Sequence, residues 1–202
     1  MQTIYKSYDE IGIDEAGRGP LIGRVYAGAV ILGKDIKCDL IDDSKKLTPK
    51  KRAIALKWIK ENVAAWGVGY AEPEEIDNVN ILEATNLAMK RAITNLKEHN
   101  PKYNNSMSLI IDGINWNNRF PNYTVESVIK GDATYFSIAC ASIIAKEYHD
   151  MHINELCTIN KELDIKYDLL KCMGYGTKKH LLGLEQYGPS TYHRKSFKPI
   201  KK

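Results

Sequence analysis

The chain has 202 residues, of which 44% are hydrophobic and 27% charged, and 29 Lys and Arg against 25 Asp and Glu give a formal net charge of +4. This balance excludes a disordered polyelectrolyte and a histone-like basic peptide, and the length fits one folded domain. The small total hides a separation of charge, because residues 171–202 carry a net +7 and the residues before them a net −3. A basic segment of this kind could contact a polyanion, and added salt would weaken such a contact.

Strands dominate the first third of the chain. Branched and apolar residues predict strands over Asp9–Asp14 and Val25–Leu32, and the dense turn formers between them make the pair a hairpin. A helix is expected over Pro49–Asn62, because Pro is favoured at the first helical position and Thr48 is placed to cap it. A third strand follows over Val63–Tyr70.

Helices dominate the remainder of the chain. Acidic residues after Pro73 suit the first turn of a helical region that ends before Pro101, with Asn80 or Asn86 as a break. An i, i+3, i+4, i+7 apolar pattern predicts a helix from Ala133. The other predicted elements are strands over Met107–Ile111 and Tyr123–Val128 and a last helix over about Thr177–Gln186.

The cysteines and the apolar segments bear on the compartment. The four cysteines form neither a C-x-x-C pair nor a zinc-ligand spacing, which favours a reducing environment. The N-terminal MQTIYKSYDE lacks the basic and apolar segments of a secretory signal. The most apolar run, Val25–Leu32, is far shorter than the roughly 18 residues of a membrane span. We therefore expect a cytoplasmic protein.

Four acidic residues stand at the ends of predicted elements: Asp14, Glu15, Asp112 and Asp132. Carboxylates gathered at the rim of a sheet would bind hard cations such as Mg²⁺ or Mn²⁺, as in two-metal phosphodiesterases. Structural roles compete with this one, because Asp132 is placed to cap a helix and Asp112 with Gly113 to form a turn. The adjacent Asp14 and Glu15 offer little to a fold, but spacing alone leaves both interpretations open.

Two segments could contact phosphates. The backbone N–H groups of Gly17-Arg18-Gly19 could approach a phosphate or sugar closely, although a tight turn is an equal alternative for so short a pattern. A basic run follows, with Lys45-Lys46 and Lys50-Lys51-Arg52, and it is either a solvated face or a polyanion contact.

These short segments, together with others, occur in one order along the chain. They are Asp14-Glu15-Ala16-Gly17-Arg18-Gly19-Pro20, Asp43-Ser44-Lys45-Lys46-Leu47, Asp112-Gly113, Lys130-Gly131-Asp132, Ser137-Ile138-Ala139, Ala141-Ser142-Ile143-Ile144-Ala145-Lys146, Gly174-Tyr175-Gly176-Thr177 with His180, and His193-Arg194-Lys195-Ser196-Phe197. Their order and spacing, from Ile11 to Phe197, resemble the ribonuclease HII family.

The resemblance implies an α/β chain with a ribonuclease H-like fold, a mixed five-stranded sheet flanked by helices, with a helical C-terminal extension. It also implies a single catalytic domain over residues 1–202. Within that domain we expect a ribonuclease H-like core over about 1–155 and a substrate-binding extension over about 156–202.

The activity that the resemblance implies is that of a metal-dependent endonuclease. Such an enzyme cuts the RNA strand of RNA–DNA hybrids and nicks duplex DNA on the 5′ side of an embedded ribonucleotide, leaving 3′-hydroxyl and 5′-phosphate ends. Its roles would be to remove misincorporated ribonucleotides and RNA primers.

The resemblance also assigns roles to individual residues. Two Mn²⁺ or Mg²⁺ ions would be held by four catalytic carboxylates, Asp14, Glu15, Asp112 and Asp132. The substrate-binding residues would be Gly17, Arg18 and Gly19 at the ribonucleotide 2′-OH, Tyr175 against the neighbouring nucleotide, and Ser44, Lys45 and Lys46 at phosphates.

Several alternatives accompany this assignment. Type 1 ribonuclease H and integrase-like transferases lack the Gly-Arg-Gly loop after the paired acids, and ribonuclease HIII normally carries an N-terminal substrate-binding domain, for which the chain leaves no room before Asp14. A catalytically dead binding module would be expected to lack one of the four acids. Arg24, Cys140 and His149 depart from the residues usual in the family, and His149 with His152 lacks a third zinc ligand.

We expect a monomer. The sequence does not indicate whether a replication clamp docks, because Lys198–Lys202 is too short and polar for a clamp-binding motif.

Overall fold

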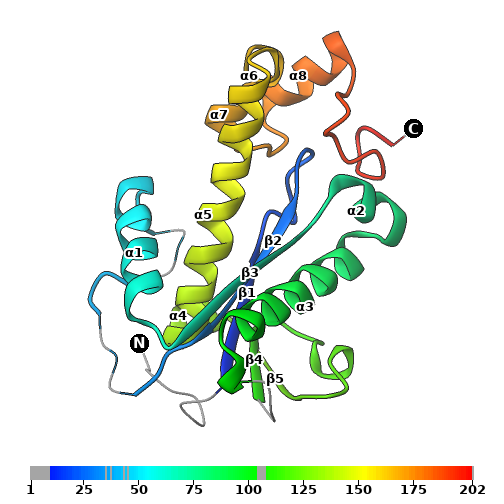
Figure 1. Cartoon of the computed structure of the whole chain (residues 1–202). Helices are drawn as coiled ribbons and strands as arrows, with labels where there is room; N and C mark the ends of the chain where they lie inside the picture. The colour runs from blue at the N-terminus through cyan, green and yellow to red at the C-terminus, as the bar shows by residue number, and fades with distance from the viewer. Residues whose placement is uncertain are drawn as a thin grey trace.

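The protein is built around one mixed sheet of five strands. The computed structural model describes residues 10–34, 36, 38–42, 44, 46–103 and 108–201. The strands are β1 (Ile11–Ala16), β2 (Val25–Ile31), β3 (Ala65–Ala71), β4 (Ser108–Asp112) and β5 (Thr124–Val128), in the spatial order β3-β2-β1-β4-β5 (Figure 1). β1 pairs antiparallel with β2 and β2 with β3, whereas β1 with β4 and β4 with β5 are parallel. The predicted hairpin and mixed five-stranded sheet are therefore confirmed.

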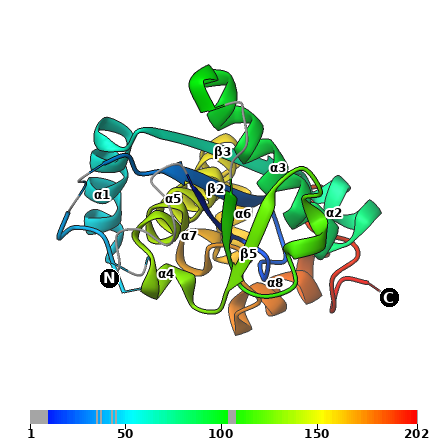
Figure 2. The ribbon, with the colours of Figure 1, turned by 90° about the horizontal axis from the view of Figure 1, so that it is seen from below.

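Helices cover both faces of the sheet. The helix α3 (Ile81–His99) packs on one face, and α1 (Pro49–Asn62) and α5 (Phe136–Ile159) pack on the other (Figure 2). Two strand glycines allow the close approach of α5, because a Cβ atom at Gly12 would lie 2.5 Å from the Cβ of Ser137 and one at Gly28 would overlap the backbone of Ala141. None of the helices in the described part of the chain is long and apolar enough to cross a membrane.

The helical region after Pro73 is divided at one of the two predicted breaks. The helix α2 (Pro73–Val79) is followed by Asn80, which adopts a φ of 72° and interrupts the helix. The Asn80 side chain then accepts hydrogen bonds from the N–H groups of Leu82 and Glu83 and so caps α3. Asn86 lies within α3, so the alternative break there is wrong.

The helix predicted from Ala133 is two helices. A short α4 (Gly131–Thr134) contains Asp132, and α5 begins after Tyr135, which has extended backbone angles. Lys130 and Tyr135 occupy the N-cap positions of α4 and α5, so the interpretation of Asp132 as a helix cap is wrong. The structure also contains two short 3₁₀ helices, Pro101–Tyr103 and Asn117–Arg119.

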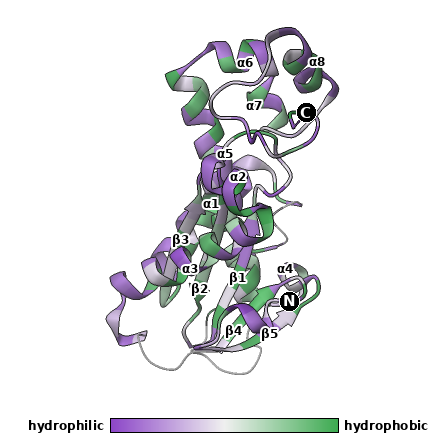
Figure 3. Cartoon of the chain, turned by 90° about the vertical axis from the view of Figure 1, so that its right-hand side faces the viewer, coloured by the Kyte–Doolittle hydropathy of each residue, from purple (hydrophilic) through white to green (hydrophobic). Residues whose placement is uncertain are grey.

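A group of small helices lies beyond one end of the sheet. It consists of α6 (Glu162–Tyr167), α7 (Leu169–Cys172) and α8 (Lys178–Tyr187), which Figure 3 shows gathered at the far end of α5. These helices share an apolar cluster with α5 that includes Ile22, Ile153 and Leu169. The expected helical C-terminal extension is therefore present, and the expected boundary near residues 155 and 156 falls within α5.

Candidate active site

A cleft of about 210 Å³ joins four separate parts of the chain. Its lining residues are Asp14, Glu15, Ala16, Gly17, Arg18, Gly19, Ser44, Ser142, Lys146 and Tyr175. A larger hollow of about 590 Å³ lies beside α3, but its principal charged groups, Glu75 and Arg91, already form an ion pair of 2.7 Å. The smaller cleft is the candidate site, because it gathers the sequence segments that carry the predicted chemistry.

Asp14 and Glu15 lie inside β1 and not at its end, because β1 continues to Ala16 through its pairing with Tyr26 of β2. Asp14 is only 5% exposed, and its Oδ1 accepts a hydrogen bond of 2.7 Å from the Glu15 N–H. Burial raises the pKa of Asp14 well above its ordinary value, and the charges of Glu15 and Asp112 raise it further. The fold thus places the buried carboxyl group of Asp14 close to those of Glu15 and Asp112.

Glu15 has one partner and one orphan oxygen. Burial raises the pKa of Glu15, and an ion pair of 3.0 Å with the Arg18 guanidinium opposes that shift. The other carboxylate oxygen, Oε2, is buried without a hydrogen-bond partner in the described structure. An unsatisfied carboxylate oxygen next to another buried acid is what a cation would stabilise.

Asp112 lies at the end of β4, and Asp132 lies in the first turn of α4, next to the residue that contacts Asp112. Asp112 ends β4, and Gly113 after it has a φ of 97°, so the predicted Asp-Gly turn is present. The N–H of Gly131 donates a hydrogen bond of 2.6 Å to Asp112 Oδ1, which fixes α4 to the end of β4. Asp132, the next residue, is 6% exposed. Asp112 therefore forms the predicted turn and also lies close enough to Asp14 for its charge to raise the pKa of Asp14.

The donor set fits a hard divalent cation. All four predicted ligands offer carboxylate oxygens, which Mg²⁺ and Mn²⁺ prefer, and the charge of Asp112 acts on both Asp14 and Glu15. Within the described ranges, no three carboxylate, histidine or cysteine side chains are grouped closely enough to hold an ion as they stand. The orphan Oε2 of Glu15 and the repulsion among Asp14, Glu15 and Asp112 are the observations that favour a cation here.

The glycine loop is held in shape by Arg194, which the sequence analysis named only within the resemblance. This side chain is fully buried, and its guanidinium donates hydrogen bonds of 2.6 to 3.0 Å to the carbonyl oxygens of Gly17, Arg18, Pro20, Gly23 and Arg24. In a trans peptide the C=O and the following N–H point in opposite directions. The N–H groups of Arg18 and Gly19 therefore point away from Arg194, and both residues line the cleft.

Tyr175 forms the opposite wall. A Cβ atom at Gly19 would lie 3.1 Å from Cε1 of Tyr175, so glycine leaves the ring in contact with the loop. Tyr175 as a residue is 44% exposed. Gly17 is enclosed in the same way, because a side chain there would collide with the ring of His149, and its φ is 87°.

The predicted phosphate-binding residues are placed differently from one another. Ser44 is 2% exposed, and its hydroxyl lies 2.9 Å from that of Ser142 in the cleft. Lys46 does not line the cleft, and its Nζ lies 3.6 Å from Asp42 Oδ1. Lys45 lies outside the described residues.

Two further lining residues, Ser142 and Lys146, come from α5 and were assigned no role by sequence reasoning. Lys146 is held by Asp150 at 2.7 Å, and Asp150 also accepts a hydrogen bond of 2.9 Å from Arg52. Arg52 is 6% exposed and binds Glu147 at 2.6 Å, which ties α1 to α5. Their i, i+4 spacing, which places both side chains on one face of a largely buried helix, was the feature of the sequence that could have indicated that they share a site.

Comparison with known proteins identifies the family. A sequence model of ribonuclease HII matches residues 11–200. A ribonuclease HII of Bacteroides thetaiotaomicron is 47% identical over 197 residues, which cover 98% of this chain and 93% of the relative.

Solved structures show the same fold. Ribonuclease H2 of Pyrococcus horikoshii OT3 matches with a TM-score of 0.69 at 24% identity, covering 94% of each chain. Ribonuclease HII of Archaeoglobus fulgidus, solved in complex with PCNA, matches with a TM-score of 0.71 at 21% identity, covering 96% of each chain. The resemblance predicted from the sequence motifs is thus confirmed over nearly the full length, and the chain belongs to the ribonuclease HII family, whose members are ribonuclease H endonucleases acting on RNA–DNA hybrids.

Proposed function

We propose that this enzyme also nicks duplex DNA on the 5′ side of a single embedded ribonucleotide, by hydrolysis with two Mg²⁺ or Mn²⁺ ions that leaves 3′-hydroxyl and 5′-phosphate ends. One observation carries the proposal: the cleft is lined by the adjacent acids Asp14 and Glu15 and by Arg18 and Gly19, whose N–H groups point away from Arg194. The acids suit metal-assisted hydrolysis, and the N–H groups suit recognition of a sugar hydroxyl.

The four carboxylates Asp14, Glu15, Asp112 and Asp132 would hold the ions. When bound, divalent ions lower the pKa of water and neutralise charge that develops on the phosphate. The protein's own contribution is to bury Asp14 and to leave only 14% of the Glu15 side chain exposed, so that their charges attract cations more strongly than they would in open solvent. The Ser142 hydroxyl, hydrogen-bonded to Asp14, orients that carboxylate.

Recognition of RNA would be the task of the glycine loop and Tyr175. The N–H groups of Arg18 and Gly19 would bind the 2′-OH, which is what distinguishes a ribonucleotide from a deoxyribonucleotide. The exposed face of Tyr175 would stack on the neighbouring nucleotide. Ser44 would contact a phosphate from within the cleft. We propose that Lys45 and Lys46 also contact phosphates, Lys46 from outside the cleft.

The test uses two labelled duplexes, one containing a single ribonucleotide and one a long RNA–DNA hybrid, each with Mg²⁺, Mn²⁺ or EDTA. We expect both to be cut with either metal, and the single ribonucleotide to be cut once on its 5′ side. Asp14→Asn and Asp132→Asn should abolish cutting, while Glu155→Gln, an exposed acid on α5, should not affect it. An enzyme that cuts hybrids but spares the single ribonucleotide would contradict the proposal, as would activity in EDTA.

Further proposals concern the setting of the enzyme. We propose a single domain over residues 1–202, divided functionally near residues 155 and 156, that acts as a monomer to remove misincorporated ribonucleotides and RNA primers. A cytoplasmic location is supported by the four cysteines, which are free thiols in the structure. A stoichiometry of one chain per particle in light scattering would support the monomer.

A further inference from the structure

Two buried histidines behind the cleft have no role in the proposed chemistry. His180 lies on α8 and His193 in the segment after it, and they are 0% and 1% exposed. Their Nε2 atoms are 3.0 Å apart, a hydrogen-bond distance between two ring nitrogens. Neither residue lines the cleft.

The partners of the other ring nitrogens fix the direction of this hydrogen bond. His180 Nδ1 lies 3.0 Å from the carbonyl oxygen of Tyr175, and because a carbonyl only accepts, Nδ1 carries the hydrogen. His193 Nδ1 accepts a hydrogen bond of 2.9 Å from the Ser190 N–H, so its hydrogen is on Nε2. The two neutral rings form a relay that runs from Ser190 N–H through His193 and His180 to the Tyr175 carbonyl.

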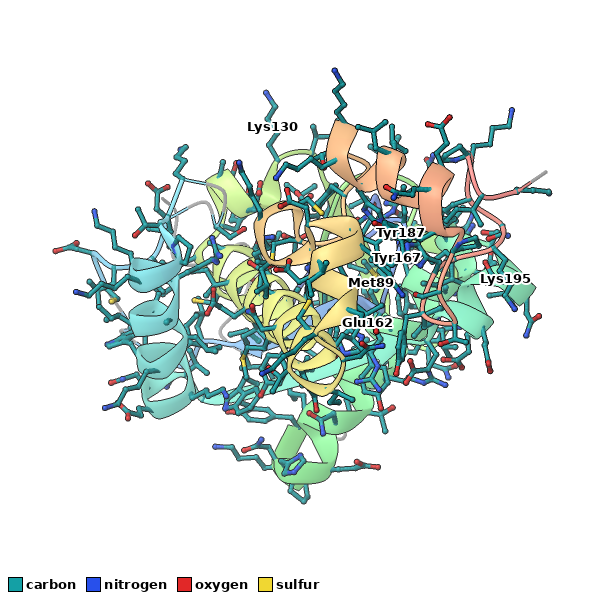
Figure 4. All side chains as sticks on the ribbon, turned by 90° about the horizontal axis from the view of Figure 1, so that it is seen from above. Met89, Lys130, Glu162, Tyr167, Tyr187 and Lys195 are labelled. Atoms are coloured by element: carbon teal, nitrogen blue, oxygen red, sulfur yellow. The ribbon has the colours of Figure 1, made fainter. Side chains whose placement is uncertain are left out.

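The surroundings keep both rings neutral. Burial lowers the pKa of His193 to about 3, with the neighbouring His180 as a second cause, and burial also lowers the pKa of His180. Tyr167, which is labelled in Figure 4, packs against both rings with centroid distances of 4.7 and 5.6 Å. The hydroxyl of Tyr167 donates a hydrogen bond of 2.7 Å to the carbonyl of Gly188 at the end of α8.

The relay ends on the backbone that carries the wall of the cleft. The residue before Tyr175, Gly174, accepts a hydrogen bond of 2.8 Å from the Leu21 N–H, so this backbone is joined to the glycine loop as well. The Tyr175 ring lies against Gly19, and both residues line the cleft. The Tyr175 carbonyl also accepts a hydrogen bond of 2.8 Å from the Thr177 N–H, so the relay supplies the second of two donors that hold this backbone.

We propose that His180 and His193 are positioning residues, whose neutral relay fixes the backbone of Tyr175 and so sets the fit of the nucleotide that neighbours the ribonucleotide. This inference rests on the proposed function, in which Tyr175 stacks on that nucleotide. The relay acts on substrate fit and not on the hydrolytic step, because its hydrogen bonds run to Tyr175 and Ser190 and to neither the acids nor the N–H groups of Arg18 and Gly19.

The experiment compares His180→Leu, which keeps bulk without hydrogen bonds, with His180→Asn, whose side-chain amide retains a donor toward the Tyr175 carbonyl. Single-turnover cleavage of the single-ribonucleotide duplex is measured at increasing enzyme concentration. For His180→Leu we expect the half-saturating concentration to rise about tenfold, with the maximal rate constant within twofold of wild type. His180→Asn should recover most of this loss, and Gln186→Ala, an exposed change on the same helix, should match wild type.

A double-mutant cycle separates positioning from general destabilisation. In a Tyr175→Ala background, His180→Leu should have no further effect on half-saturation, because the ring it positions is gone. An equal tenfold effect in both backgrounds would overturn the proposal, and so would a fall in the maximal rate constant alone.

A second measurement needs neither a variant nor activity. In ¹⁵N NMR of the wild-type protein at pH 7, we expect a neutral His180 with hydrogen on Nδ1 and a neutral His193 with hydrogen on Nε2. The opposite tautomers, or a ring that titrates near pH 6.5, would overturn the relay. A wild-type protein that cuts neither duplex would refute the proposed function. The NMR signals would still show independently whether the two histidines form the relay.

Discussion

Arg194 provides the sharpest test of how this site is built. Its guanidinium is the shared donor for five carbonyl oxygens of the loop from Gly17 to Arg24, at 2.6 to 3.0 Å. Substitution by methionine keeps much of the side-chain volume and removes every one of these donors. Lys195→Met, an exposed change at the next position, is the matched control.

The expected loss of stability follows from these contacts. Each buried carbonyl left without a donor costs about 1–3 kcal/mol, but entry of water and relaxation of the loop reduce the sum. Burial of the charge also has its own cost, which lowers the pKa of Arg194 to about 9. We therefore expect a net loss of about 3–5 kcal/mol, the range for removing one partner from a buried charged network. For a chain of this size that lowers Tm by roughly 6–20 °C.

Activity should fall as well, at a temperature where the variant is still folded. If the N–H groups of Arg18 and Gly19 lose their orientation, two hydrogen bonds of about 1–1.5 kcal/mol each are lost, which is roughly a 30- to 150-fold decrease in cleavage at a single ribonucleotide. Arg194→Lys should show a smaller loss in both measurements, because lysine has three donors in a different geometry.

The assays are calorimetric melting and single-turnover cleavage. If Arg194→Met melted within about 2 °C of wild type, Arg194 would not be holding the loop. Unchanged cleavage at the single ribonucleotide would mean that the loop N–H groups need no such support. An equal effect of Lys195→Met would show that the change reports on the segment as a whole.

Three further predictions concern stability. Asp14→Asn should stabilise the protein in EDTA, because the raised pKa of Asp14 means that its ionised form opposes folding at neutral pH. Added Mg²⁺ should stabilise the wild type more than the variant. A variant that unfolds at lower urea concentration than the wild type in EDTA would contradict the prediction. Gly12→Ala should cost about 3 kcal/mol or more by driving α5 from the sheet, and a Tm within 2 °C of wild type would count against that packing. Burial lowers the pKa of His152 to about 4 and that of His193 to about 3, so below pH 6.5 the unfolded state binds more protons than the folded state. The free energy of unfolding should therefore fall between pH 6.5 and 4 by up to about 1.4 kcal/mol per pH unit for each ring. Equal stability at pH 7 and pH 5 would refute this prediction.

Local chemistry in the sequence was enough to locate most of the elements. Thr48 and Pro49 marked the start of α1, and the Thr48 hydroxyl does accept a hydrogen bond from the Lys51 N–H. Branched residues located β2, and Asn80 was one of two predicted breaks. These signals work because caps and strand preferences depend on neighbours within a few residues.

Interactions between distant residues decided what the sequence analysis missed. β1 continues past Asp14 because its ladder with β2 extends to Ala16, so both acids lie within a strand. The division between α4 and α5 accompanies the hydrogen bond between Gly131 and Asp112, which lies on another element. Lys46 belongs to the predicted basic run, yet the fold pairs it with Asp42, outside the cleft.

The sequence by itself therefore identified the family and located most of the elements, because these depend on residue identity and local spacing. Only the tertiary structure decided that Arg194 supports the glycine loop and that His193 and His180 connect to Tyr175. The hydrogen bonds from Arg194 to Gly17 and between His193 and His180 form only when folding brings distant parts of the chain together. Such long-range contacts leave no pattern among residues that are neighbours in the sequence.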